Sequence, residues 1–266
     1  MTFRCDDGHA HDAARSGYVN LISAGGARAR GDARAQLRAR RRFLERGHYA
    51  GLARAVAAAA LARRTSAGGI AIGDFGCGEG YYAEAVLRAA GGTVVEVVAL
   101  DASKDACELA ARRLGSGASV AVADCARDVP VMDGSLDVVL SVFAPRSPSE
   151  LARVLRPGGR VVVARANEDH MVELRDVRGE GVVVLGVERD KGERVDAVMR
   201  EAGFAVESEI EIRETMSLSE DDVVDLIFMG PSGHHASSED AVRRAAAGAS
   251  RSVTSSFVVS VYALER

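Results

Sequence analysis

From Gly69 onward, the apolar residues come in short runs that alternate with segments of helical period. The strand-like runs are rich in Val, Ile and Ala and cover residues 69–76, 94–100, 119–125, 136–142 and 159–166. The helix-like segments between them cover residues 81–90, 104–114 and 149–155. Strands that alternate with helices in this way predict a parallel sheet with helices on both faces.

The pattern changes in the last third of the chain. A helical segment at residues 194–204 is followed by a strand at 205–219, a helix that reaches Asp225, and a strand at 252–266. Strands that follow each other without a full crossover indicate an antiparallel addition at one edge of the sheet. We therefore expect an α/β fold with a mostly parallel seven-stranded sheet.

The first part of the chain has a different pattern. Residues 1–27 contain Gly and Ser but no sustained period, which favours a small loop-rich or two-stranded module. Residues 32–64 have helical composition, and Gly47 and Gly51 are expected to divide them into two helices. We predict three parts: an N-terminal module (1–27), an Arg-rich helical segment (28–64) and a main domain (65–266).

Composition narrows the class of protein. A chain of 266 residues with 47% hydrophobic residues can bury a large core, and its apolar runs are shorter than the roughly 20 residues of a membrane-spanning helix. No signal-peptide pattern opens the sequence, so we expect a cytoplasmic protein without a membrane partner. The four cysteines, Cys5, Cys77, Cys107 and Cys125, are too few and too uneven for a disulfide framework, and we expect free thiols.

Charge is distributed unevenly along the chain. The formal net charge of the chain is -4, yet the segment from Arg28 to Arg64 contains eleven Arg and only two acidic residues, Asp32 and Glu45. Two interpretations stay open for this basic segment: a solvated helix face, or an electrostatic footprint for RNA, because arginine's planar fork suits phosphate.

A glycine-rich turn follows the first strand-like run of the main domain. Gly76, Gly78 and Gly80 come after an apolar strand and open a helix, so that a ligand can approach bare backbone and a helix N-terminus. The next strand ends at Asp101, about twenty residues further on, where a carboxylate can accept hydrogen bonds from ribose hydroxyls. The third strand is followed by Asp124, which is placed to bond an adenine amino group.

The string Asp74-Phe75-Gly76-Cys77-Gly78-Glu79-Gly80, with the two later acids, resembles the S-adenosylmethionine-dependent methyltransferases. The resemblance implies a Rossmann-like class I fold and S-adenosyl-L-methionine as the cofactor. The expected cofactor-binding residues are His48, Tyr49, Asp74, Gly76, Cys77, Gly78, Gly80, Tyr81, Asp101, Ala102, Asp124, Cys125 and Val142.

Further strings narrow the family. "GYVNL" at 17–21, the Arg-rich stretch 31–49, "VFAPRSPSELARVLRPGG" at 142–159, "DHMVEL" at 169–174 and "MGPSGHH" at 229–235 together resemble the 23S rRNA guanine-N1 methyltransferases. These strings extend over nearly the whole chain. The form "VFAPR" is similar to the actinobacterial branch associated with resistance to tylosin-type macrolides.

The N-terminal module departs from the family pattern. Members of that family begin with a four-ligand zinc module, Cys-x2-Cys followed by Cys-x3-His, and here only Cys5 and His9 match its second pair. His11 and Asp12 are spaced too tightly to complete a tetrahedral site. We therefore interpret residues 1–27 as a truncated or decayed remnant and expect no bound metal.

The candidate catalytic residues are Phe143, Arg146, His170 and His234. Phe143 is suited to stack on a flipped base and Arg146 to hold a phosphate or the guanine carbonyl, because their loop follows the fourth strand at the carboxyl end of the sheet. Guanine N1 carries a proton at neutral pH, so His170 or His234 is a candidate base or RNA contact. The alternative is that Phe143 belongs to the hydrophobic core and that Arg146 is an ordinary surface residue.

Two functions from different classes remain open at this stage. The first is methylation of N1 of a guanine in a 23S rRNA hairpin, either as housekeeping or as macrolide resistance. The second is methylation of a small natural product by an enzyme recruited from that family. A homodimer is compatible with either. Steep salt dependence of binding is expected only for the RNA enzyme, because phosphate contacts release counterions.

Overall fold

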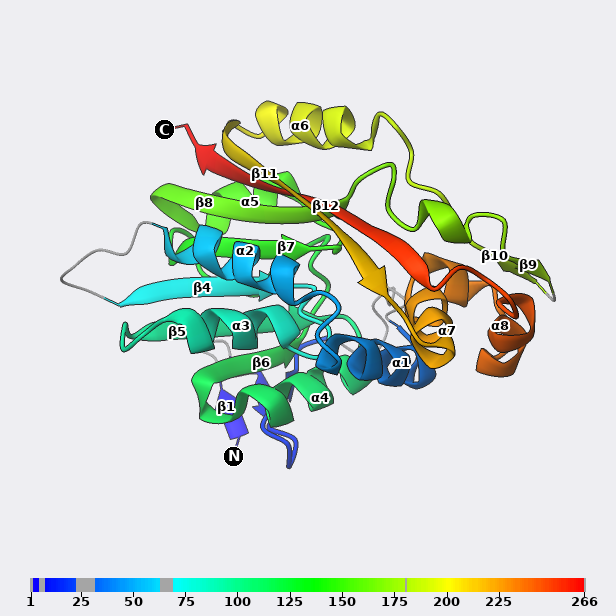
Figure 1. Cartoon of the computed structure of the whole chain (residues 1–266). Coiled ribbons are helices and arrows are strands. Elements are labelled where there is room, and N and C mark those ends of the chain that lie inside the picture. The colour runs from blue at the N-terminus through cyan, green and yellow to red at the C-terminus, as the bar shows by residue number, and fades with distance from the viewer. Residues whose placement is uncertain (1, 5–7, 23–31, 63–68, 180, 266) are drawn as a thin grey trace.

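The computed structural model describes residues 2–4, 8–22, 32–62, 69–179 and 181–265. Its main feature is a central sheet with the strand order β11-β12-β8-β7-β4-β5-β6-β3 (Figure 1). Eight strands are present instead of the expected seven, because the two-residue strand β3 (Val19–Asn20) of the N-terminal segment pairs in parallel with β6 (Ala118–Val122). The sequence pattern missed β3 because two residues carry no periodicity.

The remaining strands follow the predicted order. The parallel part contains β4 (Ile70–Phe75), β5 (Val95–Asp101), β6, β7 (Leu136–Val142) and β8 (Leu155–Ala166). Strand β12 (Ser252–Leu264) pairs antiparallel with both β8 and β11 (Phe204–Ser217), as expected for an addition at one edge. Two separate two-stranded sheets are formed by β1 (Thr2–Arg4) with β2 (Ala10–Asp12), and by β9 (Arg178–Gly179) with β10 (Val182–Val183).

Helices cover both faces of the sheet. The alternation of side chains along a strand places Val162 on one face and Val161 and Val163 on the other. The first face packs against α2 (Ala50–Leu61) and α3 (Tyr81–Ala89), and the second against α5 (Pro148–Val154) and α6 (Lys191–Glu201). Helix α4 (Lys104–Leu114) covers β5 and β6. This covered, mostly parallel sheet is the predicted class I arrangement.

Two helical segments lie beside the carboxyl ends of the strands. Helix α1 (Arg34–Glu45) precedes α2, and α7 (Glu220–Met229) leads into the short helices η3 (Pro231–His234) and α8 (Glu239–Ala245). Single 3-10 turns, η1 (Gly115–Gly117) and η2 (Val172–Leu174), complete the elements. The helix break falls at Gly47, which has a φ of 84°, whereas Gly51 lies in the first turn of α2 and does not interrupt it.

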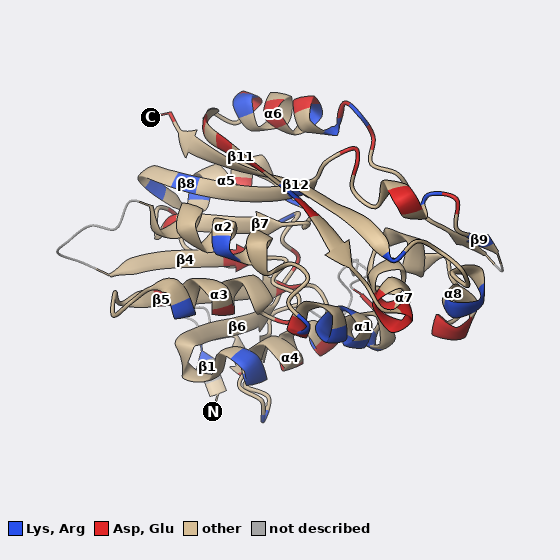
Figure 2. Cartoon of the chain, in the orientation of Figure 1, with Lys and Arg blue, Asp and Glu red and all other residues tan. Residues whose placement is uncertain are grey.

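An ion cluster joins α1 to α7 (Figure 2). The buried carboxylate of Asp225 accepts hydrogen bonds from Arg42 and from Arg46 Nη1, the latter at 3.0 Å. Arg46 Nη1 also binds Asp222 at 2.9 Å, and Arg42 Nη2 binds Glu239 at 3.0 Å. Two arginines of the basic segment are therefore used to hold two helices together.

In the described part of the chain, no helix has the length and apolar content that a membrane span requires.

We expect Asp225→Ala to lower the free energy of unfolding by about 2 to 3 kcal/mol, since it removes charge-assisted hydrogen bonds from two arginines. The loss is smaller than for a fully buried pair, because Arg42 and Arg46 stay 40% and 41% exposed and keep Glu239 and Asp222 as partners. Urea denaturation measures it. Asp221→Ala is the matched control, because that side chain is 62% exposed and should cost at most about 0.5 kcal/mol. Equal effects of both variants would contradict a structural role of the cluster.

Candidate functional site

The glycine turn between β4 and α3 has the backbone geometry that its sequence predicts. Gly76, Gly78 and Gly80 have φ values of 79°, 55° and 82°, in the left-handed region that favours glycine. A Cβ at Gly76 would lie 2.3 Å from Cβ of Ala144, so the turn packs directly against the loop that follows β7. The positions of the glycine turn and of the "VFAPR" loop are therefore mutually dependent.

The amide groups of this turn are largely used within the protein. Gly76 N and Cys77 N both donate to Leu100 O, at 2.8 and 2.9 Å, and Gly78 N donates to Asp101 Oδ2 at 2.9 Å. Asp101 Oδ1 also accepts from Ser103 N at 2.8 Å. A carboxylate has about four lone-pair sites, so Asp101 keeps capacity for ribose hydroxyls while it braces the turn.

Asp74 occupies the last but one position of β4 and is buried. Its Oδ2 has no hydrogen-bond partner among the described residues. Burial, reinforced by the nearby charge of Asp101, raises the pKa of Asp74 to about 7. A buried acceptor without a partner fits a site whose ligand brings a donor or a positive charge, and S-adenosylmethionine carries an ammonium group, a sulfonium and two ribose hydroxyls.

The other expected cofactor residues line the same strand ends. Asp124 follows β6, and its Oδ1 accepts from Ala126 N at 2.9 Å. Ala123 N donates to Asp101 O at 3.0 Å, which ties the loop after β6 to the loop after β5, where Ala102 lies. Cys125 and Val142 are buried beside them. The thiol of Cys77 is buried too, and burial raises its pKa well above the usual range, so it is a poor nucleophile.

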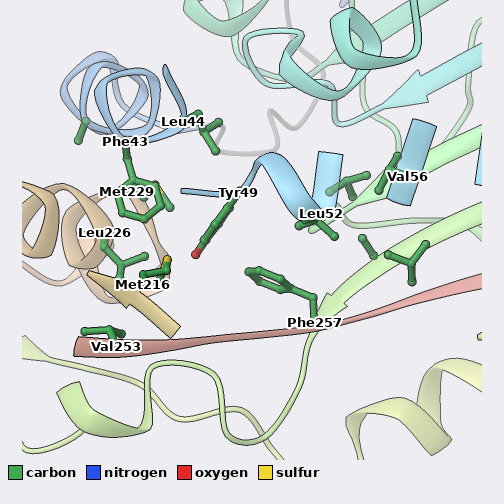
Figure 3. Close-up of a cluster of buried hydrophobic side chains, with 14 of the residues drawn as sticks. Phe43, Leu44, Tyr49, Leu52, Val56, Met216, Leu226, Met229, Val253 and Phe257 are labelled. Atoms are coloured by element: carbon green, nitrogen blue, oxygen red, sulfur yellow. The ribbon is translucent and has the colours of Figure 1, made fainter. Parts of the chain in front are cut away.

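An aromatic cluster lies beside the turn, with Phe257 of β12 in contact with three other rings. Figure 3 shows two of its members, Tyr49 and Phe257, pointing toward each other. The centroid of the Phe257 ring lies 4.8 Å from that of Tyr49, 5.5 Å from Phe143 and 4.7 Å from His170. The Tyr82 ring lies 6.4 Å from Phe143 in an edge orientation. Segments from the α1–α2 junction, α3, the β7 loop, the β8 loop and β12 therefore meet at one end of the sheet.

Phe143 is the exposed member of this cluster. Its side chain is 47% exposed, and its φ of 53° is unusual for a residue with a Cβ. Such a conformation costs of the order of 1 kcal/mol or more and persists where the surroundings impose it. An exposed aromatic ring held in a strained conformation at the carboxyl end of a parallel sheet is suited to stacking on a planar ligand.

His170 is oriented by backbone. Its Nδ1 accepts a hydrogen bond from Ser256 N at 3.2 Å, so the ring proton of the neutral form lies on Nε2, 3.3 Å from Tyr49 Oη. Burial lowers the pKa of His170 to about 4. His170 is therefore a neutral hydrogen-bond donor to Tyr49 in this arrangement, and Nδ1 has no free lone pair with which to remove a proton.

Several predicted residues lie apart from the aromatic cluster or face away from it. His48 Nε2 lies 3.0 Å from Asp222 Oδ1, and its ring packs on Phe43. Arg146 folds back onto the end of β7 and its own loop, where it donates to Ser141 Oγ at 3.0 Å and Ala144 O at 3.3 Å. Tyr81 lies 6.0 Å from the guanidinium of Arg113 and lines a groove between α2 and α3.

His234 lies at a second contact between α1 and the segment after α7. Its Nδ1 is 3.4 Å from Gln36 Nε2, and its Nε2 is 3.5 Å from Asp32 Oδ1. Gln36 also reaches Phe228 O, at 3.5 Å. His234 and His170 are thus positioned by different partners and do not form one acid–base pair.

The groove between α2 and α3 has a volume of about 900 Å³. Alanines form most of its walls, and neither Asp74 nor Asp101 lines it. We place the candidate site at the glycine turn, because the carboxyl groups that could bind a ligand lie there and not in this groove.

Three residues of the site were missed by the sequence analysis. Tyr82 and Phe257 lie in apolar segments that indicate only a helix and a strand. Arg40 lies in the Arg-rich segment, which was interpreted as a solvated face or an RNA contact, but its Nη2 binds Asp32 Oδ2 at 2.6 Å and Met229 O at 3.0 Å. A helical wheel of α1, which places Arg40 apart from Arg38 and Arg42, gives the only hint of this inward position.

The metal prediction falls in part on a residue that the structure does not describe. Cys5 lies outside the described ranges, and among the described residues no group of three or more His, Cys, Asp and Glu side chains could hold a metal ion. His11 Nδ1 lies 3.1 Å from Asn20 O. The absence of bound metal stays a prediction.

Comparisons with known proteins agree with this geometry. Residues 72–159 match a family model described as a methyltransferase domain. A 23S rRNA (guanine(748)-N(1))-methyltransferase of Streptomyces fradiae is 37% identical over 247 residues, which cover 92% of this chain and 84% of that protein. A candidate 23S rRNA (guanine-N(1)-)-methyltransferase of Micromonospora griseorubida is 38% identical over 245 residues, which cover 87% and 80%.

Solved structures show the same fold at lower identity. A chain of the complex between the Haloferax volcanii Trm112 methyltransferase activator and a methyltransferase superposes with a TM-score of 0.56 at 20% identity. The match covers 89% of this chain and 100% of that chain.

The His170 geometry generates a pH prediction. The folded pKa of about 4 lies below the ordinary value of 6.5, so the unfolded chain binds more protons between these values and stability falls as the pH decreases through this window. We expect ¹⁵N NMR to report a neutral ring with the proton on Nε2 at pH 5.5. His170→Asn should flatten the decrease in unfolding free energy below pH 6.5. A charged His170 ring at pH 5.5 would refute the assignment.

Proposed function

The chain belongs to the 23S rRNA guanine-N1 methyltransferase family, and from this premise we propose that it methylates N1 of a guanine in a 23S rRNA hairpin. The observation that carries the proposal is the identity of 37% with the Streptomyces fradiae enzyme over most of both chains. The cluster of Phe143, Tyr82 and Phe257 beside the glycine turn supports it, because a flipped base needs an aromatic surface next to the methyl donor.

The cofactor is S-adenosyl-L-methionine, as the methyltransferase domain indicates, and the residues at the strand ends fit it. We propose that Asp101 binds the ribose hydroxyls and Asp124 the adenine amino group, with Gly76, Gly78 and Gly80 allowing close approach of the ligand. The unpartnered Oδ2 of Asp74 supports a donor from the ligand at that point. When bound, the cofactor supplies a methyl group on a sulfonium, which is an electrophile that needs no covalent enzyme intermediate.

The protein's task is then to place guanine N1 in line with the carbon–sulfur bond. Transfer would form a bond from N1 to the methyl carbon as the carbon–sulfur bond breaks, with loss of the N1 proton from the ring. Phe143 would hold the base by stacking. His170, neutral and fixed by Ser256, would orient the Tyr49 hydroxyl rather than remove the proton. We propose that water accepts this proton.

The RNA contact is proposed for a smaller set of arginines than the sequence pattern indicated. Arg42 and Arg46 bind α7, Arg40 turns inward, and Arg41 pairs with Glu45 at 2.7 Å. Arg38 is exposed, and no carboxylate of the described residues pairs with it. This internal pairing is the one observation that favours the alternative, methylation of a small natural product.

Further proposals concern the location of the protein, antibiotic resistance and the oligomeric state. Action on rRNA would place the enzyme in the cytoplasm, and modification of a macrolide site would confer resistance. A homodimer through the edge strand β11 is disfavoured, since it would bring the acidic residues Glu207, Glu209, Glu211 and Glu214 of two copies close together. Any dimer is therefore proposed to use another surface.

The function is tested by incubating 23S rRNA hairpin transcripts with the protein and labelled cofactor, then mapping the methylated nucleoside by mass spectrometry. We expect one N1-methylguanosine. Arg38→Gln should weaken RNA binding and reduce the salt slope by roughly 0.7 to 0.9 for the lost phosphate contact. Arg41→Gln is the control, because Arg41 already pairs with Glu45. Methylation of no RNA, with binding indifferent to salt, would favour the small-molecule alternative.

The cofactor site is tested separately by calorimetry. Asp101→Ala should weaken S-adenosylmethionine binding by about 1 to 3 kcal/mol, because it removes an acceptor for the ribose and the brace of Gly78. Asp105→Ala, at the exposed start of α4, should leave affinity unchanged. Unchanged affinity in Asp101→Ala would remove that residue from the proposed site.

A further inference from the structure

Arg40 differs from its neighbours on α1 in facing the cofactor turn. Its side chain is 28% exposed, and Nη2 is held by Asp32 Oδ2 and by Met229 O. Its other terminal nitrogen, Nη1, points to the turn, where it would lie 3.6 Å from a Cβ built on Gly78. One nitrogen of the guanidinium thus anchors the side chain, while the other faces the proposed ligand.

The immediate surroundings are acidic. Asp32, Asp74 and Asp101 lie around the turn, and burial raises the pKa of both Asp74 and Asp101. These carboxyl groups suit the hydroxyls and positive charges of S-adenosylmethionine. They do not suit its carboxylate, which needs a cation or free amide groups.

Four amides of the turn are already used within the protein. The N–H groups of Gly76, Cys77 and Gly78 donate to Leu100 O and Asp101, and Gly80 N donates to Cys77 O at 2.9 Å. The turn therefore cannot bind an anion with these four groups, unlike a turn whose amides point at a phosphate. A cationic side chain directed at the turn would supply a charge-assisted hydrogen bond to the carboxylate, which is stronger than a bond from a neutral amide.

Other nearby arginines are already engaged. Arg113 is held by Glu79 and Glu84, each at 2.9 Å, and Arg146 by Ser141 and Ala144 on its own loop. Among the described residues around the turn, Arg40 is thus the cation with a nitrogen directed at it.

We propose that Arg40 Nη1 binds the carboxylate of the methionine part of S-adenosylmethionine while Nη2 stays on Asp32 and Met229 O. Arg40 is then a cofactor-binding residue, not part of an RNA-binding face. The inference rests on the cofactor named in the proposed function, but not on the proposed RNA substrate.

The test compares two ligands that differ only in the group concerned: S-adenosylmethionine and decarboxylated S-adenosylmethionine. Calorimetry should show at least tenfold tighter binding of the first by the unaltered protein. Arg40→Gln should weaken S-adenosylmethionine binding about ten- to hundredfold, the range for a charge-assisted hydrogen bond, and leave the decarboxylated ligand unchanged. Arg40→Lys should retain part of the preference, because it keeps the charge.

Arg41→Gln is the matched control on the adjacent position and should change neither affinity. Equal weakening of both ligands by Arg40→Gln would overturn the proposal, because it would show a purely structural role through Asp32. Equal binding of both ligands by the unaltered protein would overturn it without any variant, so the test does not depend on how well Arg40→Gln folds. Since no RNA enters the titration, failure to methylate RNA would count against the proposed substrate alone.

Discussion

The buried carboxylate of Asp225 has to be neutralised, and this requirement fixes where α1 lies. Arg42 and Arg46 reach it from one face of α1. With α1 held against α7, Arg40 on another face comes over the glycine turn, and Tyr49 at the end of the helical segment enters the aromatic cluster. This ion cluster lies outside the proposed site, yet it sets the positions of Arg40 and Tyr49 within that site.

The sheet provides the second fixed frame. Parallel strands bring the ends of β4, β5, β6 and β7 to one edge, so Asp74, Asp101, Asp124 and Phe143 meet although they are far apart in sequence. The antiparallel strand β12 adds Phe257 and the Ser256 amide, which orient Tyr49 and His170. Thus the cofactor side depends on the parallel strands, and the proposed base-binding side depends on the edge addition.

Local patterns predicted the mostly parallel α/β sheet, the antiparallel edge and the glycine turn, because apolar period and glycine spacing are properties of short segments, whereas the class I fold was implied by the family resemblance. The eighth strand was missed, since Val19 and Asn20 form a strand only by pairing with β6. The roles of the arginines on α1 could not be predicted either. Arg40 binds Met229 O and Arg42 binds Asp225, and both partners lie about 190 residues away in sequence. The sequence near the two arginines therefore does not show which partner each one binds.

Strand order has a consequence for how the molecule is made. Strand β11 pairs only with β12 in the central sheet, and β12 is the last of the described strands to leave the ribosome. Until it emerges, β8 has an unpaired edge, and the rings of Tyr49 and Phe143 lack the Phe257 side chain between them. The nascent chain can thus form the parallel strands and the glycine turn early, but the aromatic cluster is completed only after β12 has been synthesised.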